Sequence, residues 1–196
     1  FISPNYLSDW RAQTFSFKEP ETLDWIDTMK DEEIFWDVGA NIGVFSLYAA
    51  KAKNANVFSF EPSVFNLELL ARNIFQNGLQ DKISIVPIAL NETSGTDILR
   101  MSMTHWGGAM STFGQTFTHD GTILKEVFSY RIPACSMDDA AAFFDLPKPS
   151  ALKIDVDGIE HLILKGGSKI LHDNTLKTII IEVNDDFSEQ SEVVKS

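Results

Sequence analysis

Cysteines, long apolar runs and clusters of basic residues are scarce in this sequence, and each scarcity excludes a class of protein. Cys135 is the one cysteine in 196 residues, which excludes an internal disulfide bond and fits a reducing, cytoplasmic location. No apolar run approaches the ~20 residues of a membrane-spanning helix. The 16 lysines and arginines form no block and face 28 acidic residues. Because nucleic-acid binding depends on clustered cations, we expect neither a nucleic-acid partner nor a membrane span.

The remaining sequence is typical of one globular domain. It is 44% apolar, and strand-like apolar runs alternate with helix-like patterns of period 3.6. The predicted strands cover 34–38, 57–60, 83–88, 128–132, 151–155 and 178–183. The predicted helices cover 20–29, 43–51, 63–76, 137–144 and 158–165. This alternation predicts an α/β, Rossmann-like, doubly wound and mostly parallel sheet. We expect a helical or irregular segment over 1–33 and one domain over 34–196, with an insert at about 91–136.

A glycine-bearing turn follows the first predicted strand and opens a helix. It reads Asp37-x-Gly39-x-Asn41-x-Gly43, and the next strand ends at Glu61. A strand-end carboxylate in such a βαβ unit can bind a ribose diol. The acid at 37 and the lack of a glycine at 41 favour a cationic, phosphate-free nucleoside such as S-adenosylmethionine over a dinucleotide.

Carboxylates also follow the later strands. Asp155, Asp157 and Glu182 stand at or just beyond predicted strand ends, where parallel α/β sheets bind ligands. One such residue can simply cap the next helix, but several on one edge favour a ligand site. With Asn184 they could instead form an oxygen-rich cradle for Mg²⁺ or Ca²⁺. The spacing of these residues is not that of a metal-binding motif, so we rank the metal site second to a ligand site.

Five segments in order resemble the FkbM-type S-adenosylmethionine-dependent methyltransferases: 37–43, 61–62, 87–90, 153–160 and 179–182. The resemblance implies O-methylation of a small sugar, glycosylated or polyketide-like acceptor. It implies that the cofactor is held by Asp37, Gly39, Ala40, Asn41, Gly43, Glu61, Pro62, Ser63, Asn66, Ala89 and Leu90. The family shows glutamate where this chain has Asp157. The fold would add a terminal strand hairpin, which we expect to be absent or outside this sequence because few residues follow Val183.

The insert is predicted to be a substrate lid. Gly107-Gly108 favours a hinge, so the loop at 105–112 is expected to be mobile without an acceptor. His105 lies in this loop and joins Asp155 and Asp157 as a catalytic candidate, whereas His161 is predicted to face solvent. Two alternatives stay open: a nicotinamide-dependent oxidoreductase and a nucleoside-binding domain without catalysis.

Overall fold

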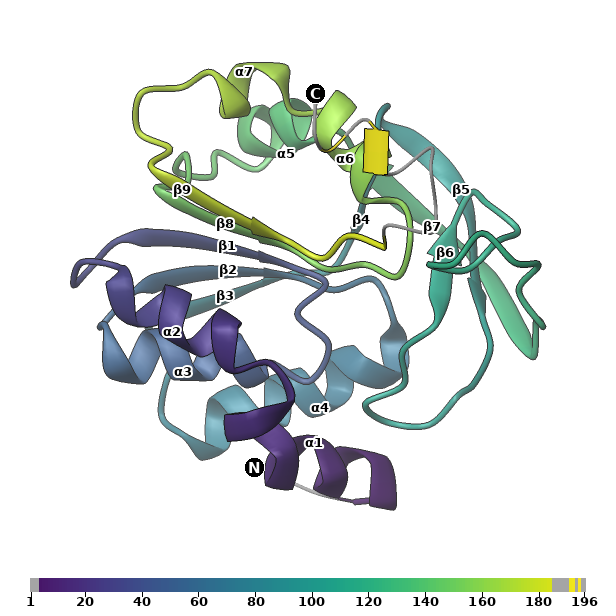
Figure 1. Cartoon of the computed structure of the whole chain (residues 1–196), viewed down its shortest axis with the longest axis horizontal. Coiled ribbons are helices and arrows are strands. Elements are labelled where there is room, and N and C mark those ends of the chain that lie inside the picture. The colour runs from purple at the N-terminus through teal and green to yellow at the C-terminus, as the bar shows by residue number, and fades with distance from the viewer. Residues whose placement is uncertain (1–3, 185–190, 193, 195–196) are drawn as a thin grey trace.

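The computed structural model describes residues 4–184, 191–192 and 194, and it contains two sheets (Figure 1). The strands are β1 Ile34–Val38, β2 Asn56–Phe60, β3 Ile83–Val86, β4 Ala89–Leu90, β5 Gly95–Met101, β6 Ser111–Phe113, β7 Phe128–Cys135, β8 Ala151–Ile154 and β9 Thr178–Ile181. The helices are α1 Tyr6–Lys18, α2 Pro20–Thr28, α3 Val44–Ala52, α4 Val64–Gln76, α5 Met137–Phe143, α6 Glu160–Lys165 and α7 Ser168–Leu171.

The first sheet confirms the predicted Rossmann-like fold. Its order is β3-β2-β1-β8-β9 and all its neighbouring strands are parallel. Figure 1 shows α2, α3 and α4 on one face and α5, α6 and α7 on the other. The order reverses direction beside β1, so the carboxyl ends of β1, β2 and β8 open onto the topological switch point where such sheets bind ligands.

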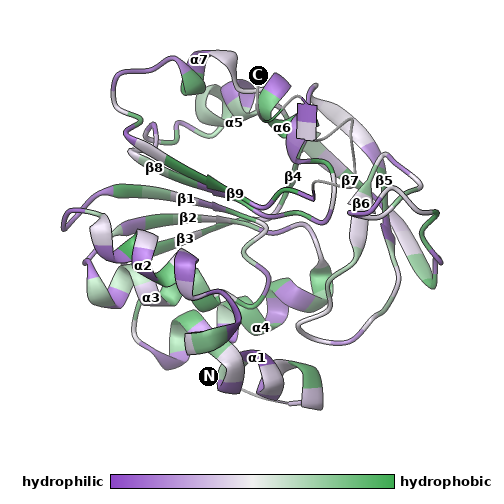
Figure 2. Ribbon diagram, in the orientation of Figure 1, coloured by the Kyte–Doolittle hydropathy of each residue, from purple (hydrophilic) through white to green (hydrophobic). Residues whose placement is uncertain are grey.

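Alternate residues of β1 supply two separate cores. Phe35 packs with Ile26, Leu47 and Leu70 of the helices on one face, whereas Trp36 packs with the other core cluster. This division follows from the period of two along a strand. Figure 2 shows hydrophobic colour along the central strands, as expected for a sheet that is covered on both faces.

The insert forms a sheet of its own, and it was only partly predicted. β7 includes the predicted strand at 128–132 and continues to Cys135, which is buried as expected. β5 and β6 were not predicted; they complete an antiparallel arrangement with β7, and β4 adds a short parallel pair. Figure 1 places this second sheet beyond the carboxyl ends of the parallel strands.

The amino-terminal segment forms two helices. α1 begins with a capping box in which Asn5 and Ser8 each accept a hydrogen bond from the other's backbone, and Pro20 starts α2 as predicted. No helix of the described residues has the length and apolar content needed to cross a lipid bilayer. The region after Asn184, where a terminal hairpin would begin, lies mostly outside the described residues.

Candidate functional site

The turn after β1 approaches the neighbouring strand end too closely for any side chain. Gly39 has φ +83°, and a Cβ atom on it would lie 1.8 Å from the carbonyl oxygen of Asp155. Asn41 also has a positive φ, 52°, in the left-handed region that asparagine adopts more readily than most residues. The N–H groups of Gly39 and Ala40 donate to the Phe60 carbonyl, which ties the turn to the end of β2.

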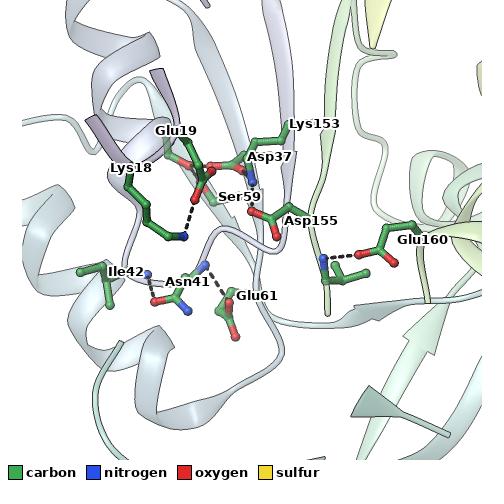
Figure 3. A network of polar contacts seen from close by, with 12 residues as sticks. Lys18, Glu19, Asp37, Asn41, Ile42, Ser59, Glu61, Lys153, Asp155 and Glu160 are labelled. Atoms are coloured by element: carbon green, nitrogen blue, oxygen red, sulfur yellow. Dashed lines mark hydrogen bonds and ion pairs between the residues drawn. The ribbon is translucent and has the colours of Figure 1, made fainter. Parts of the chain in front are cut away.

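Glu61 lies immediately beyond β2 and is only 5% exposed. Its Oε2 accepts the Asn41 N–H at 2.8 Å (Figure 3). Its Oε1 accepts the Ser63 N–H at 2.8 Å. Burial raises the pKa of Glu61 to about 7, although both N–H groups act to lower it. The Asn66 side chain also hydrogen-bonds this carboxylate and acts to lower its pKa. Because each carboxylate oxygen has two acceptor sites, Glu61 keeps acceptor capacity beyond these contacts.

A pocket with about 550 Å³ of empty space, part of it open to solvent, lies beside Glu61. It is lined by many of the predicted site residues: Gly39, Asn41, Glu61, Pro62, Asn66, Ala89, Leu90, Asp155 and Asp157. The lining combines polar groups with apolar side chains, which include Ile88 from the connection between β3 and β4 and Leu99 and Phe113 from the second sheet. We call this space the nucleoside pocket.

The glycine pair of the insert closes one side of this pocket. The Gly108 carbonyl accepts from the side-chain amides of Asn41 (2.8 Å) and Asn66 (3.0 Å), and the Gly107 N–H donates to Asn66 Oδ1 at 3.0 Å. Arg11 Nε of α1 donates to the Gly107 carbonyl at 2.7 Å. The predicted lid is therefore anchored in this structure from the turn after β1, from α4 and from α1.

A buried lysine links the ends of β1 and β8. Lys153 Nζ lies 2.7 Å from Asp155 Oδ2 and 3.8 Å from Asp37 Oδ1 (Figure 3). Burial acts to lower the pKa of Lys153, but the two carboxylates outweigh it and raise that pKa. Asp37 is 1% exposed, and its Oδ2 accepts from Ser46 at 2.5 Å. Asp37 thus stabilises the ammonium from beneath the site and does not line the nucleoside pocket.

Asp155 and Asp157 belong to the loop after β8, because that strand ends at Ile154. Burial acts to raise the pKa of Asp155, but Lys153 and a hydrogen bond with Glu182 outweigh it and lower that pKa. The same hydrogen bond, followed by burial, raises the pKa of Glu182, so the two carboxyl groups favour sharing one proton.

Asp157 connects the parallel sheet to the insert. Its Oδ2 accepts the Met110 N–H at 2.7 Å and the Ser111 N–H at 3.3 Å. Burial raises the pKa of Asp157, and the negative charge of Asp155 adds to the rise. The backbone at Asp157 has a positive φ of 64°, so the loop needs support to hold it.

Glu160 supplies that support, and sequence reasoning missed it. Its carboxylate is 1% exposed and accepts the Val156 N–H at 2.9 Å and the Gly158 N–H at 3.0 Å. It thereby fixes the backbone on both sides of Asp157. An acid two residues after a glycine in a strand-to-helix turn is a signal that could have suggested a loop-capping carboxylate.

The apolar wall was also missed. Leu99 and Met101 are buried in β5 on either side of the partly exposed Arg100, an alternation that is typical of a half-buried strand. That pattern could have identified β5 and hence Leu99 as a wall residue. Phe113 has no comparable local signal, because it lies in a three-residue strand that is defined by pairing with β5.

The other predicted residues do not line the pocket; they are Asp37, Ala40, Gly43, Ser63 and His105. A Cβ on Gly43 would lie 2.4 Å from Leu70 Cδ1, so this glycine serves close packing of α3 on α4. Ser63 is at the N-cap position of α4, as predicted, but its side chain makes no capping hydrogen bond and it contributes its N–H to Glu61. His105 is exposed.

The prediction for His161 was wrong. This side chain is 1% exposed, not solvent-facing. The insert packs over the start of α6, because a Cβ on Gly158 would lie 2.9 Å from the Cα of His119. Local periodicity could not show this cover, since it comes from a segment about 40 residues away in the sequence.

The alternative of an oxygen-rich metal cradle finds no support in the placement of these side chains. Over residues 4–184, no group of three or more His, Cys, Asp or Glu side chains is placed to hold a metal ion. Lys153 already neutralises Asp155, which would otherwise be the central ligand.

Comparisons with known proteins agree with this geometry. A family described as the methyltransferase FkbM domain matches residues 37–195. Hexuronic acid methyltransferase AglP from Haloferax volcanii is 25% identical over 177 residues, covering 89% of this chain and 66% of that protein.

Two solved structures share the fold. Methyltransferase FkbM from Methylobacillus flagellatus superposes with a TM-score of 0.52 at 19% identity, covering 77% of this chain and 33% of that one. Precorrin-6y C5,15-methyltransferase from Geobacter metallireducens gives a TM-score of 0.55 at 16% identity, covering 100% of this chain and 75% of that one. The chain therefore spans slightly less than two thirds of AglP and about a third of the FkbM structure.

Proposed function

The chain belongs to the FkbM methyltransferase family, and from this premise we propose that it transfers a methyl group from S-adenosylmethionine to a hydroxyl oxygen of a sugar or sugar-bearing acceptor. The observation that carries the proposal is Glu61, a buried carboxylate that lines a pocket and has acceptor capacity left for a ribose hydroxyl. The match to a hexuronic acid methyltransferase supports a sugar acceptor.

The residues of the nucleoside pocket fit this cofactor along its length. Glu61 would hold the ribose, while Ile88, Leu90 and Leu99 offer an apolar surface to the adenine. The opposite end, at Gly39 and Asp155, would hold the methionine part, where a carboxylate suits an ammonium group. When bound, the cofactor supplies a methyl group on a positively charged sulfur, which is open to in-line displacement by a hydroxyl oxygen.

Of the candidate bases, Asp157 is the better proton acceptor. Lys153 holds Asp155 in its charged form and lowers its basicity, whereas burial and Asp155 raise the basicity of Asp157. We assign Asp155 to positioning and charge balance near the sulfonium, and Asp157 to the proton of the acceptor hydroxyl. His105 is exposed and away from the pocket lining, so we give it no role in proton transfer.

Equilibrium titration tests the cofactor. Isothermal calorimetry with S-adenosylmethionine, S-adenosylhomocysteine and NADH should give micromolar binding of the first two and none of the third. Tight NADH binding without S-adenosylhomocysteine binding would overturn the proposal in favour of an oxidoreductase.

The two carboxylates are separated by Asp155→Asn and Asp157→Asn, with Asp81→Asn as the control because Asp81 is exposed and lies just before β3, at the other end of the sheet. We expect Asp157→Asn to lower the methyl-transfer rate ~10²–10⁴-fold with little change in S-adenosylhomocysteine affinity. Asp155→Asn should lower affinity and rate together. Full activity in Asp157→Asn would remove it from the mechanism.

A further inference from the structure

A second pocket meets the nucleoside pocket at Asp155. It has about 400 Å³ of empty space and lies between the start of α2 and the carboxyl ends of β8 and β9. Asp155 lines both pockets, so the two share a wall at the end that would hold the methionine part of the cofactor. We call it the β9 pocket. An acceptor held there would extend past Asp155 toward this shared end, where Asp157 of the nucleoside pocket would meet its hydroxyl group.

The lining of the β9 pocket is mostly acidic. Its charged residues are Glu19, Glu21, Lys153, Asp155 and Glu182, four carboxyl groups against one ammonium. Lys153 is 3% exposed and already contacts two carboxylates, so its charge is balanced within the protein. Figure 3 shows Glu19 on the same side as Lys153 and Asp155, with its carboxylate turned toward Lys18.

The helix end at the start of α2 does not make the net charge of the β9 pocket positive. A helix N-terminus carries the equivalent of about half a positive elementary charge, which on its own would favour an anion. Glu19 and Glu21 stand at that N-terminus. Glu19 is paired with Lys18, so Glu21 is the residue that adds negative charge there. Counting Lys18 and Lys153 against the four carboxyl groups leaves the pocket about one charge negative when Asp155 and Glu182 share one proton, and the helix end offsets only part of it.

Apolar side chains and a threonine complete the lining of the β9 pocket. Ile180 and Ile181 of β9 give the pocket an apolar side, and the buried Thr22 contributes to the α2 side. A carboxylate accepts hydrogen bonds from hydroxyl groups, and a protonated carboxyl group also donates one. This combination suits the hydroxyl-bearing face and the C–H face of a pyranose ring. It penalises a carboxylate on the ligand, which would lie among like charges.

We propose that the β9 pocket binds the methyl acceptor and selects a neutral or amino-bearing polyhydroxyl compound over an acidic one. The inference rests on the proposed methyltransferase function and refines its substrate class. It separates this chain from the relative named as a hexuronic acid methyltransferase, whose printed substrate carries an acid group.

Three matched probes test the selection: methyl glucoside, methyl glucosaminide and methyl glucuronide, each with the purified protein in complex with S-adenosylhomocysteine. Saturation-transfer NMR should show contacts from the first two and at least tenfold weaker contacts from the glucuronide. Methyl transfer from labelled S-adenosylmethionine should rank the probes in the same order by kcat/KM. An equal or stronger glucuronide signal, or no contact from any probe, overturns the inference.

The variants Glu19→Gln and Glu21→Gln remove one lining charge each, and the double variant removes two. We expect the double variant to narrow the discrimination against glucuronide at least threefold, while Asp81→Asn leaves it unchanged. Unaltered discrimination in the double variant would overturn the role of these charges. Calorimetry with S-adenosylhomocysteine keeps the two proposals apart, because intact binding with the wrong acceptor order refutes only the acceptor inference.

Discussion

The two sheets contribute different kinds of groups to the nucleoside pocket. Loops at the ends of the parallel strands provide its carboxylates, Glu61, Asp155 and Asp157. The insert sheet provides apolar wall residues, Leu99 and Phe113. Charged recognition is therefore built where strand ends and turns fix the backbone, while the insert excludes water. Changes at the parallel edge should affect binding, and changes in the insert sheet should mainly affect packing.

The largest expected effect is Gly39→Ala. Because a Cβ there would lie 1.8 Å from the Asp155 carbonyl oxygen and φ is positive, the loop after β8 has to move. We expect a loss of about 3–5 kcal/mol in the free energy of unfolding, measured by urea denaturation, and loss of S-adenosylhomocysteine binding.

Gly95→Ala is the matched control in the insert sheet. Nothing lies within 4 Å of a Cβ at Gly95, so we expect less than about 1 kcal/mol of change in stability and unaltered binding. Similar losses of stability and binding in Gly39→Ala and Gly95→Ala would contradict the view that the edge of the parallel sheet controls binding more than the insert sheet does.

Glu61→Gln is expected to weaken S-adenosylhomocysteine binding by about 1.5–3 kcal/mol, because it removes a charge-assisted acceptor and turns one amide N–H toward a backbone N–H. Calorimetry measures the affinity.

Leu99→Ala is the matched variant in the apolar wall of the nucleoside pocket. Leu99 is 2% exposed, and its truncation should lower the free energy of unfolding by about 2–4 kcal/mol with a smaller loss of affinity than Glu61→Gln. A larger affinity loss in Leu99→Ala than in Glu61→Gln would mean that the apolar wall, and not the carboxylate, dominates cofactor binding.

The difference between the sheets also explains what the sequence could predict. β1 and its turn were predictable, because a strand buried on both faces gives the apolar run Ile34–Val38 and the following glycines specify the turn. The position of Glu61 followed from the end of β2. These signals are local, and parallel topology brings them to one edge.

The missed features depend on contacts between distant segments. Phe113 becomes a wall residue only through pairing with Leu99 in β5. Glu160 acts by reaching back to the N–H groups of Val156 and Gly158. The anchoring of Gly108 needs amides from two different elements. Such contacts leave little trace in hydrophobic periodicity, so residues 105–112 of the insert were predicted to be a mobile loop.

The pH dependence of binding should distinguish Glu61 from the wall. Its pKa of about 7 in the folded protein lies above the ordinary value of 4.5, so between these values the folded state holds a proton that the unfolded state has lost. The stability contributed by Glu61 therefore falls as the pH rises through this window and is constant above it. Cofactor binding needs the charged form and should weaken roughly tenfold from pH 8 to pH 6. Calorimetry should show this slope in Leu99→Ala and a flat profile in Glu61→Gln; a slope that survives in Glu61→Gln assigns the titration to another group.

The smallest expected effect concerns the glycine pair that joins the two sheets. Asn66 is 4% exposed, accepts the Gly107 N–H and donates to the Gly108 carbonyl. Since one hydrogen bond contributes about 0.5–1.5 kcal/mol net, Asn66→Ala should speed hydrogen exchange of the Gly107 amide by roughly tenfold. The Gly114 amide donates to the Ile98 carbonyl at 3.0 Å within the insert and should keep its rate. Equal acceleration at both amides would indicate general loosening of the insert. A Gly107 amide that exchanges at the unprotected rate in the unmodified protein would instead mean that the loop is free, as its two glycines alone predict.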